Sequence, residues 1–348
     1  MKIILHKIPF LIAVLLGLVL FIFILFQALP GPEQILSSQR SDAATTEAIT
    51  KELGLNQPIW WQALSYLNDV SPISYYQSTS IPIEVRGLHI TMGESTFWLK
   101  LPYLRTSFQT KREVSSMLGD AFIGTMVLAG AAMLFSMLIG IPLGILAALK
   151  KNTWLDHSIV WLSTLGISVP SFFSAMLFSW LFGYVYQSYS GLPMTGSLIE
   201  LDDLGEHRTL HLNHLVLPAL ALGIRPLAVF IQLTRNTVAD VMEMDFVTTA
   251  YAKGLTRSVV IKRHILPNSL NPIVTSIGGW FSSLLAGSFF TEYIFQWKGL
   301  GKITIEALQQ SDLPVVMGAV LFTACVFFIV HIFTEVLYVW MDPRLRNN

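Results

Sequence analysis

The chain alternates between long apolar runs and polar stretches, and six of the apolar runs are long enough to predict membrane helices. The runs cover residues 8–29, 121–149, 159–186, 215–233, 273–295 and 313–340. A helix rises 1.5 Å per residue, so about 20 apolar residues cross the roughly 30 Å hydrocarbon core. The pattern predicts an all-α membrane protein with six transmembrane helices.

The first run, 8–29, could be either a membrane helix or a cleaved signal peptide. It is longer than a typical signal-peptide core, and no Ala-x-Ala-like cleavage site follows it before Pro30. We therefore expect residues 1–29 to remain as the amino terminus and the first membrane helix.

Composition agrees with a chain that lies in a bilayer. Of 348 residues, 53% are hydrophobic and 13% are charged, whereas charged residues make up about a quarter of a soluble domain. The formal net charge is zero, so no basic or acidic excess argues for a nucleic-acid partner. The single cysteine, Cys325, has no second cysteine with which to form a disulfide or a thiolate metal site.

Basic residues near the ends of the runs predict the orientation, because Lys and Arg in short loops resist translocation. With an amino terminus inside, alternating the spans places every basic cluster in the cytoplasm: Lys2 and Lys7, Lys150 and Lys151, residues 235–263, and Arg344 and Arg346. Both termini are therefore predicted inside. Residues 30–120 form an extracytoplasmic segment with a short helix expected at 45–53, 121–340 a five-helix core with a cytoplasmic loop at 236–267, and 341–348 a cytoplasmic tail.

The cytoplasmic loop carries the most informative pattern. Asp245 is positioned to cap a short helix with small side chains at Thr248, Thr249 and Ala250, and Gly254 is suited to end it in the left-handed conformation. Thr256 is positioned to cap a second helix that leads to Pro267. A slender helix held between two spans is suited to lie in a groove of a soluble partner and act as a lever.

The alternative for this loop is a connector that follows the membrane surface. Lys253, Arg257, Lys262 and Arg263 suit anionic headgroups, and the residues alone leave both readings open.

The loop resembles the cytoplasmic signature of permease subunits of binding-protein-dependent ABC importers, Glu-Ala-Ala, three residues, Gly, nine residues, Ile-x-Leu-Pro. The match is good at Ala250, Gly254, Leu266 and Pro267. Thr248 and Thr249 stand in place of the opening Glu and first Ala, and His264 stands in place of the Ile. These departures indicate a subfamily.

Further motifs extend over nearly the whole chain and resemble those of the dipeptide, oligopeptide and nickel permeases. They are Glu-Leu-Gly-Leu-Asn-Gln-Pro at 52–58, Gly-Ile-Pro-Leu-Gly at 140–144, Ser-Val-Pro-Ser at 168–171, Leu-Pro-Ala at 217–219, Phe-Gln-Trp-Lys-Gly-Leu-Gly at 295–301 and Asp-Pro-Arg at 342–344. They follow the order of that family, each at a matching topological place.

The resemblance implies a type I ABC-importer permease fold in the bacterial inner membrane. It implies a second permease subunit, two ATP-binding subunits, an extracytoplasmic substrate-binding protein and a di- or oligopeptide substrate, with a nickel complex or another small solute as the alternative. The ATPase-coupling residues it implies are Asp245, Thr248, Thr249, Ala250, Lys253, Gly254, Leu255, Leu266 and Pro267.

The chain itself is not predicted to hydrolyse ATP or to bind a cofactor. A phosphate-binding loop ends in Gly-Lys-Ser/Thr, and no lysine here is followed by Ser or Thr; Lys302, the nearest candidate, precedes Ile303. ATP and Mg²⁺ are therefore expected on partner subunits.

Two groups of polar residues remain as weaker candidates. Arg225, inside the fourth run, and Glu292, inside the fifth, are candidates to line the translocation path, where Arg225 would meet a substrate carboxylate. The alternatives for Arg225 are that it pairs with an acid such as Glu292 or reaches solvent. His207, His211 and His214 would share one face of a helix and form a possible metal site, but polar residues are also ordinary where a span meets water.

Two other function classes have less support in the sequence than a permease. A membrane-embedded hydrolase lacks support because the chain has neither His-Glu-x-x-His nor Gly-x-Ser-x-Gly. An ion-driven secondary transporter would show internal repeats and several intramembrane acids, and the sequence shows neither.

Overall fold

The computed structural model describes residues 2–27, 57–77, 87–92, 95–201 and 207–341. The helix expected at 45–53 and the tail after residue 341 lie outside these ranges. The chain divides into two compact units: Met1–Asp120 with Ile303–Val326, and Ala121–Lys302 with Phe327–Asn348.

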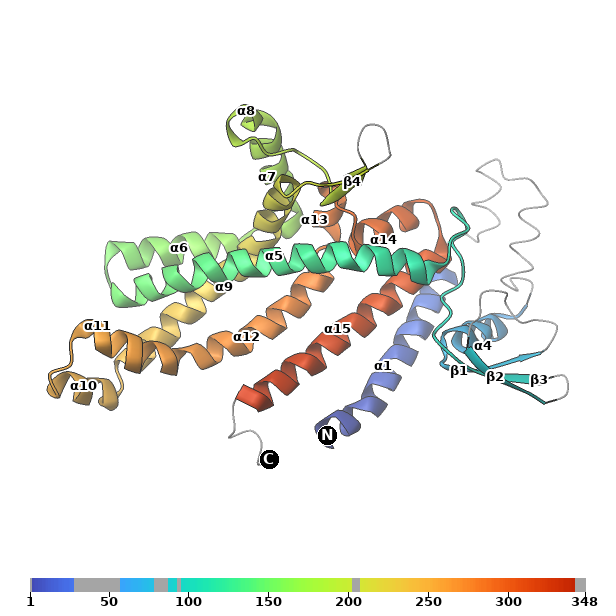
Figure 1. Ribbon diagram of the computed structural model, residues 1–348, viewed down its shortest axis with the longest axis horizontal. Coiled ribbons are helices and arrows are strands. Elements are labelled where there is room, and N and C mark those ends of the chain that lie inside the picture. The colour runs from blue at the N-terminus through green and yellow to red at the C-terminus, as the bar shows by residue number, and fades with distance from the viewer. Residues whose placement is uncertain (1, 28–56, 78–86, 93–94, 202–206, 342–348) are drawn as a thin grey trace. The chain divides into compact units, whose positions relative to one another are not determined.

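Long helices dominate both units (Figure 1). They are α1 (Lys2–Gln27), α5 (Val114–Leu149), α9 (Asn213–Met242), α12 (Leu266–Gly287) and α15 (Leu313–Met341). In the described chain, α5, α9 and the Leu313–Val336 part of α15 are long and apolar enough to cross a membrane, which confirms three of the predicted spans as helices. The count of six remains a prediction, as does the orientation.

The predicted span at 159–186 is wrong as a single straight helix. The structure has α6 (Trp154–Ser168), then α7 (Ser171–Trp180) continued by a π-helical turn (Leu181–Val185), with a bend of 103° between the two parts. Pro170 explains the break, because a proline disfavours helical geometry in the residue before it, and Val169 is extended. If this bent pair is one span, the described chain has four candidate spans.

The segment predicted to be extracytoplasmic contains a small sheet, so the all-α expectation does not extend to it. Helix α4 (Ile59–Val70) is followed by antiparallel strands β1 (Ile73–Gln77), β2 (Gly87–Met92) and β3 (Ser95–Lys100), in the order β1-β3-β2. In a usual half-buried sheet the apolar side chains are buried and the polar ones exposed, and here the reverse holds. Ser74, Tyr76, Thr96 and Lys100 are buried, whereas Ile73, Tyr75, Leu88, Ile90, Phe97 and Leu99 are exposed.

A polar cluster ties α4 to this sheet. The Asp69 carboxylate pairs with Arg105 at 2.8 Å and accepts a hydrogen bond from the Tyr76 hydroxyl at 3.0 Å. The Lys100 ammonium donates to the Asp69 carbonyl at 2.8 Å and to the Tyr76 hydroxyl at 2.6 Å. Burial lowers the pKa of Lys100 to about 8, against the opposing effect of Asp69. The segment is thus held partly by buried polar groups.

Close packing of α5 on α9 organises the second unit. A Cβ at Gly144 would lie 2.6 Å from the Thr234 Cβ, and a Cβ at Gly140 would lie 3.0 Å from the Leu227 carbonyl oxygen. The two glycines of the Gly-Ile-Pro-Leu-Gly motif therefore let the helices approach closely. One turn further along α5, Ala148 is buried.

Shorter elements complete the fold. They are α8 (Gln187–Ser190), β4 (Ile199–Leu201), β5 (Arg208–Leu210), α10 (Asp245–Ala252), α11 (Arg257–Val260), a π-helical turn (Ile261–Ile265), α13 (Phe289–Ile294) and α14 (Leu300–Gln309). Helix α13 follows a break at Ser288, so the predicted span at 273–295 is also interrupted.

Candidate functional site

Helix α10 lies in the predicted cytoplasmic loop, two residues after α9 ends. Its Val247 and Ala250 are 2% and 5% exposed and join a core with residues from the end of α5, the end of α9, the end of α11 and the π-helical turn after it. The other members of that core are Ala148, Val238, Ala239, Val241, Val260 and Ile265. Apolar burial, worth about 25 cal/mol per Å², therefore fixes α10 to both of its neighbouring long helices.

The opposite face of α10 is open. Asp245, Thr248, Thr249, Lys253 and Leu255 are all exposed, so the coupling residues implied by the resemblance divide between a buried Ala250 and an outward face. Leu266 is half-buried and Pro267 is exposed.

Two large side chains on this surface were missed by the sequence reasoning. Phe246 and Tyr251 are 39% and 43% exposed, and they flank the small Thr248 and Thr249. Each is four residues from a buried position, Phe246 from Ala250 and Tyr251 from Val247, so the two aromatic side chains border the buried face on either side and helical spacing alone does not predict their exposure. The surface thus combines two aromatic side chains with small ones, which suits a groove in a partner protein.

Gly254 ends α10 as predicted. It has φ +78°, the Leu255 N–H donates to the Ala250 carbonyl at 3.3 Å, and the Gly254 N–H donates to the Tyr251 carbonyl at 2.9 Å. This pair of bonds is the Schellman motif, in which a glycine takes the left-handed position without strain. Apart from the glycine and its two chain neighbours, no described atom lies within 4 Å of the place where a Cβ would stand, so this position is sterically open.

The helix starts differ from the expectation. Met244 is the N-cap of α10, no side chain caps it, and Asp245 is its first residue, where a carboxylate is still favourable to the helix dipole. Thr256 is the N-cap of α11, again without a side-chain bond. The helix after it does not end at Pro267 but continues through the π-helical turn into α12, because a wider turn accommodates the missing proline N–H.

Arg225 and Glu292 are not paired with each other. Arg225 is exposed and makes no hydrogen bond or ion pair with any residue the structure describes. Glu292 is fully buried, and its carboxylate is held elsewhere.

The Glu292 carboxylate closes the turn between α13 and α14. It accepts hydrogen bonds from the Thr125 and Ser288 hydroxyls, both at 2.8 Å, and from the Gly301 N–H at 2.6 Å. The Lys302 N–H lies 3.4 Å away. This arrangement joins α5, the break before α13 and the start of α14.

The three histidines do not share a helix face. Arg208–Leu210 is strand β5 and α9 begins only at Asn213, so the expected helical spacing does not exist. His211 and His214 stack at 4.9 Å, but a nitrogen of each bonds elsewhere, His211 to the Thr209 hydroxyl and His214 to the Ser197 carbonyl. Among the described residues no group of three potential ligands could hold a metal ion; Asp202, Asp203 and Glu206 lie outside them.

Comparisons with known proteins agree with this architecture. Residues 140–347 match the family described as binding-protein-dependent transport system inner membrane component. The dipeptide transport system permease protein DppB of Escherichia coli strain K12 is 33% identical over 100% of this chain and 99% of its own length. The di/tripeptide permease DppB of Pseudomonas aeruginosa strain UCBPP-PA14 is 32% identical over 99% and 98%.

A solved structure supports the fold alone. An inward-facing form of the MetNI methionine ABC transporter matches with a TM-score of 0.52 at 12% identity, covering 66% of this chain and 97% of that chain. The chain belongs to the family of binding-protein-dependent transport system inner membrane components. It is a membrane permease subunit of such a transport system, as the resemblance predicted.

Proposed function

We propose that this chain is one permease half of an ATP-driven importer that carries di- or oligopeptides across the bacterial inner membrane by alternating access. A second permease subunit completes the pore, two ATP-binding subunits hold ATP and Mg²⁺, and an extracytoplasmic binding protein delivers the substrate. ATP closes the motor, displaces α10 and opens the pore outward; hydrolysis resets it.

The geometry of α10 carries this proposal. One face is fixed by Val247 and Ala250 to a core shared with α5 and α9, and the other face is exposed. A force applied to the exposed face therefore reaches two long helices without a flexible linker. A loop that only followed the membrane surface would not need this buried anchor.

Peptide cargo is favoured by the names of the relatives, which include dipeptide, di/tripeptide and glutathione permeases. None of these three names favours the nickel-complex alternative. For the substrate path we retain Arg225, because it is exposed and unpaired among the described residues and a peptide carboxylate would suit it. Glu292 is better assigned to holding its own turn.

The test uses the whole assembly, reconstituted in liposomes with its binding protein. We expect Gly254→Trp to abolish peptide uptake and its link to ATP hydrolysis, because a bulky side chain would separate α10 from its partner. The matched control is Gly191→Trp, since Gly191 also has a positive φ, +63°, and open surroundings. Both variants carry a similar left-handed strain of about 1–2 kcal/mol, so only docking distinguishes them.

Unimpaired uptake by the Gly254→Trp assembly would overturn the proposal. Full uptake by this chain without ATP-binding subunits would overturn it as well.

A further inference from the structure

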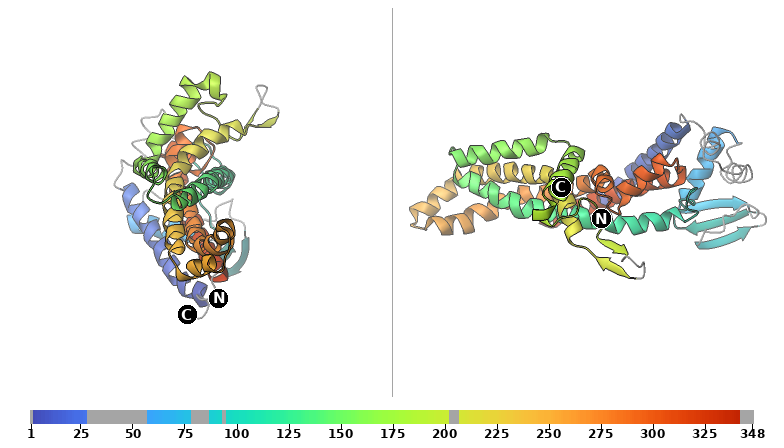
Figure 2. Two further views of the ribbon diagram at one scale, coloured as in Figure 1. Left: turned by 90° about the vertical axis from the view of Figure 1, so that its left-hand side faces the viewer. Right: turned by 90° about the horizontal axis from the view of Figure 1, so that it is seen from above.

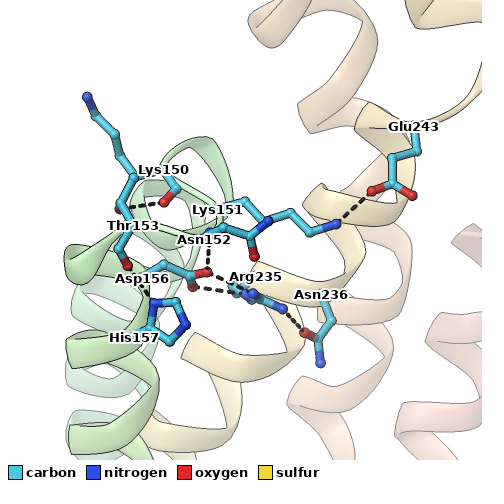
Figure 3. A network of polar contacts seen from close by, with 9 residues as sticks. All are labelled: Lys150, Lys151, Asn152, Thr153, Asp156, His157, Arg235, Asn236 and Glu243. Carbon is cyan, nitrogen blue, oxygen red and sulfur yellow. Dashed lines mark hydrogen bonds and ion pairs between the residues drawn. The ribbon is translucent and has the colours of Figure 1, made fainter.

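A bidentate ion pair joins the first turn of α6 to helix α9 (Figure 3). The Arg235 Nε donates to one oxygen of Asp156 at 3.0 Å, and Nη2 donates to the other at 2.8 Å. Such fork geometry is among the stronger charge-assisted arrangements and fixes orientation as well as distance. We call this pair the α6–α9 clasp.

The clasp is built into the fold and is not a surface contact. Asp156 is 2% exposed, and its carboxylate also accepts the Asn152 N–H at 3.0 Å, in a turn where Asn152 has φ +63°. The carboxylate therefore organises the turn and holds Arg235 at once. Removing Arg235 leaves the buried Asp156 carboxylate without its counter-charge, whereas the Arg235 side chain is 24% exposed and can still reach water.

Further contacts join the same two helices about one turn away along α9 and two turns away along α6. The Gln232 amide donates to the Ser163 and Thr164 hydroxyls at 3.1 and 3.2 Å. A Cβ at Gly166 would lie 3.4 Å from the Ala228 Cβ, so the helices lie close there as well. Helices α6 and α9 lie side by side, as the view from above shows (Figure 2, right).

The same end of α9 leads directly to α10. Arg235 lies ten residues before Asp245, the first residue of α10, and the core beneath α10 includes Val238 and Ala239 of α9. Ala148 of α5 lies in that core too, four residues before the Asn152 turn that Asp156 holds. A displacement of α10 would therefore move the end of α9 and the end of α5, which leads into the α5–α6 turn, because all three share this core.

We propose that Asp156 and Arg235 are positioning residues that make the α5–α6 turn and α9 move as one piece with α10. The motion of α10 then reaches α6 as well as α9. This inference rests on the proposed coupling function of α10 and adds the residues through which its displacement passes to α6. Without the clasp, α9 would move while α6 lagged, and ATP would be consumed with less uptake.

The test measures peptide uptake per ATP hydrolysed in the reconstituted full assembly. We expect Asp156→Asn and Arg235→Lys each to lower this ratio by about tenfold, the size of an ordinary coupling between sites, in assemblies of normal subunit composition. The double variant Asp156→Arg with Arg235→Asp is expected to recover part of the ratio, which a purely destabilising substitution would not do. The matched control is Glu243→Gln, because the Lys151–Glu243 pair joins the same segments but is exposed.

An unchanged ratio in correctly assembled Asp156→Asn and Arg235→Lys proteins would overturn the clasp. Gly254→Trp separates this failure from failure of the proposed function. Loss of uptake in Gly254→Trp with an unchanged ratio in the clasp variants overturns only the clasp, whereas normal uptake in Gly254→Trp overturns the function itself.

Discussion

Two buried carboxylates in the same unit, Asp156 and Glu292, are satisfied in opposite ways. Asp156 lies at the start of α6 and binds a guanidinium fork from Arg235. Glu292 lies in α13, inside the fifth predicted span, and binds the hydroxyls of Thr125 and Ser288 together with backbone N–H groups. One site uses an opposite charge, and the other uses neutral dipoles.

The kind of hydrogen-bond donor at each carboxylate follows from the surroundings of that carboxylate. A cation brought into an apolar layer has its own desolvation cost, whereas hydroxyls and backbone amides are already there and carry no net charge. Hydroxyl groups can also reverse their roles and accept a hydrogen bond, which a guanidinium cannot do. The two sites should therefore respond differently to the same chemical change.

The largest effect on stability is expected from Glu292→Ala. It leaves two hydroxyls and at least one backbone amide without their acceptor and opens a cavity, which together destabilise by about 3–5 kcal/mol. A fall in the amount of intact assembly and in its thermal midpoint, measured in detergent, would report this. A midpoint equal to wild type would mean that water or another acceptor replaces the carboxylate.

The amide substitutions contrast the two sites directly. In Asp156→Asn an amide NH₂ replaces one of the two oxygens that accept hydrogen bonds from Arg235, so two donors face each other. This should lower the free energy of unfolding by about 2–3 kcal/mol. Glu292→Gln should cost less than about 1 kcal/mol, because its amide oxygen can accept from the Gly301 N–H while its NH₂ donates to the Thr125 and Ser288 hydroxyls. Thermal midpoints of the two variants, compared in one buffer, measure the difference. If the two variants lost the same amount of thermal stability, charged and neutral donors would not differ in the way proposed here.

The smallest effect is expected at the exposed pair. Lys151 and Glu243 approach to 2.6 Å, but their side chains are 41% and 70% exposed, so water and salt screen the attraction. The hydrogen bond from Lys151 lowers the pKa of Glu243, and the small contribution of a depressed carboxyl pKa is lost as the pH falls through that pKa. We expect Lys151→Met to leave the thermal midpoint at neutral pH unchanged within experimental scatter, at both low and high salt. A clear drop in the midpoint would show that this exposed ion pair stabilises the fold.

Sequence reasoning succeeded where the signal was local. The helices α5, α9 and α15 follow from apolar runs alone, and the left-handed Gly254 follows from a glycine after small helical residues. It failed at the bend before Pro170 because a proline within an apolar run is tolerated in some helices, including Pro218 and Pro226 in α9, and breaks others. It also missed the sheet, whose apolar face is exposed and whose buried face carries Ser74, Tyr76 and Lys100.

By itself the sequence determined the membrane class, the loop that we propose to couple to the ATP-binding subunits, and the absence of a phosphate-binding motif, because hydropathy and short motifs depend on neighbouring residues. Only the tertiary structure decided which acids are paired and with what. Asp156 and Arg235 are 79 residues apart, and Thr125 and Glu292 are 167 apart. No local pattern specifies such partners; the close approach of packed helices does.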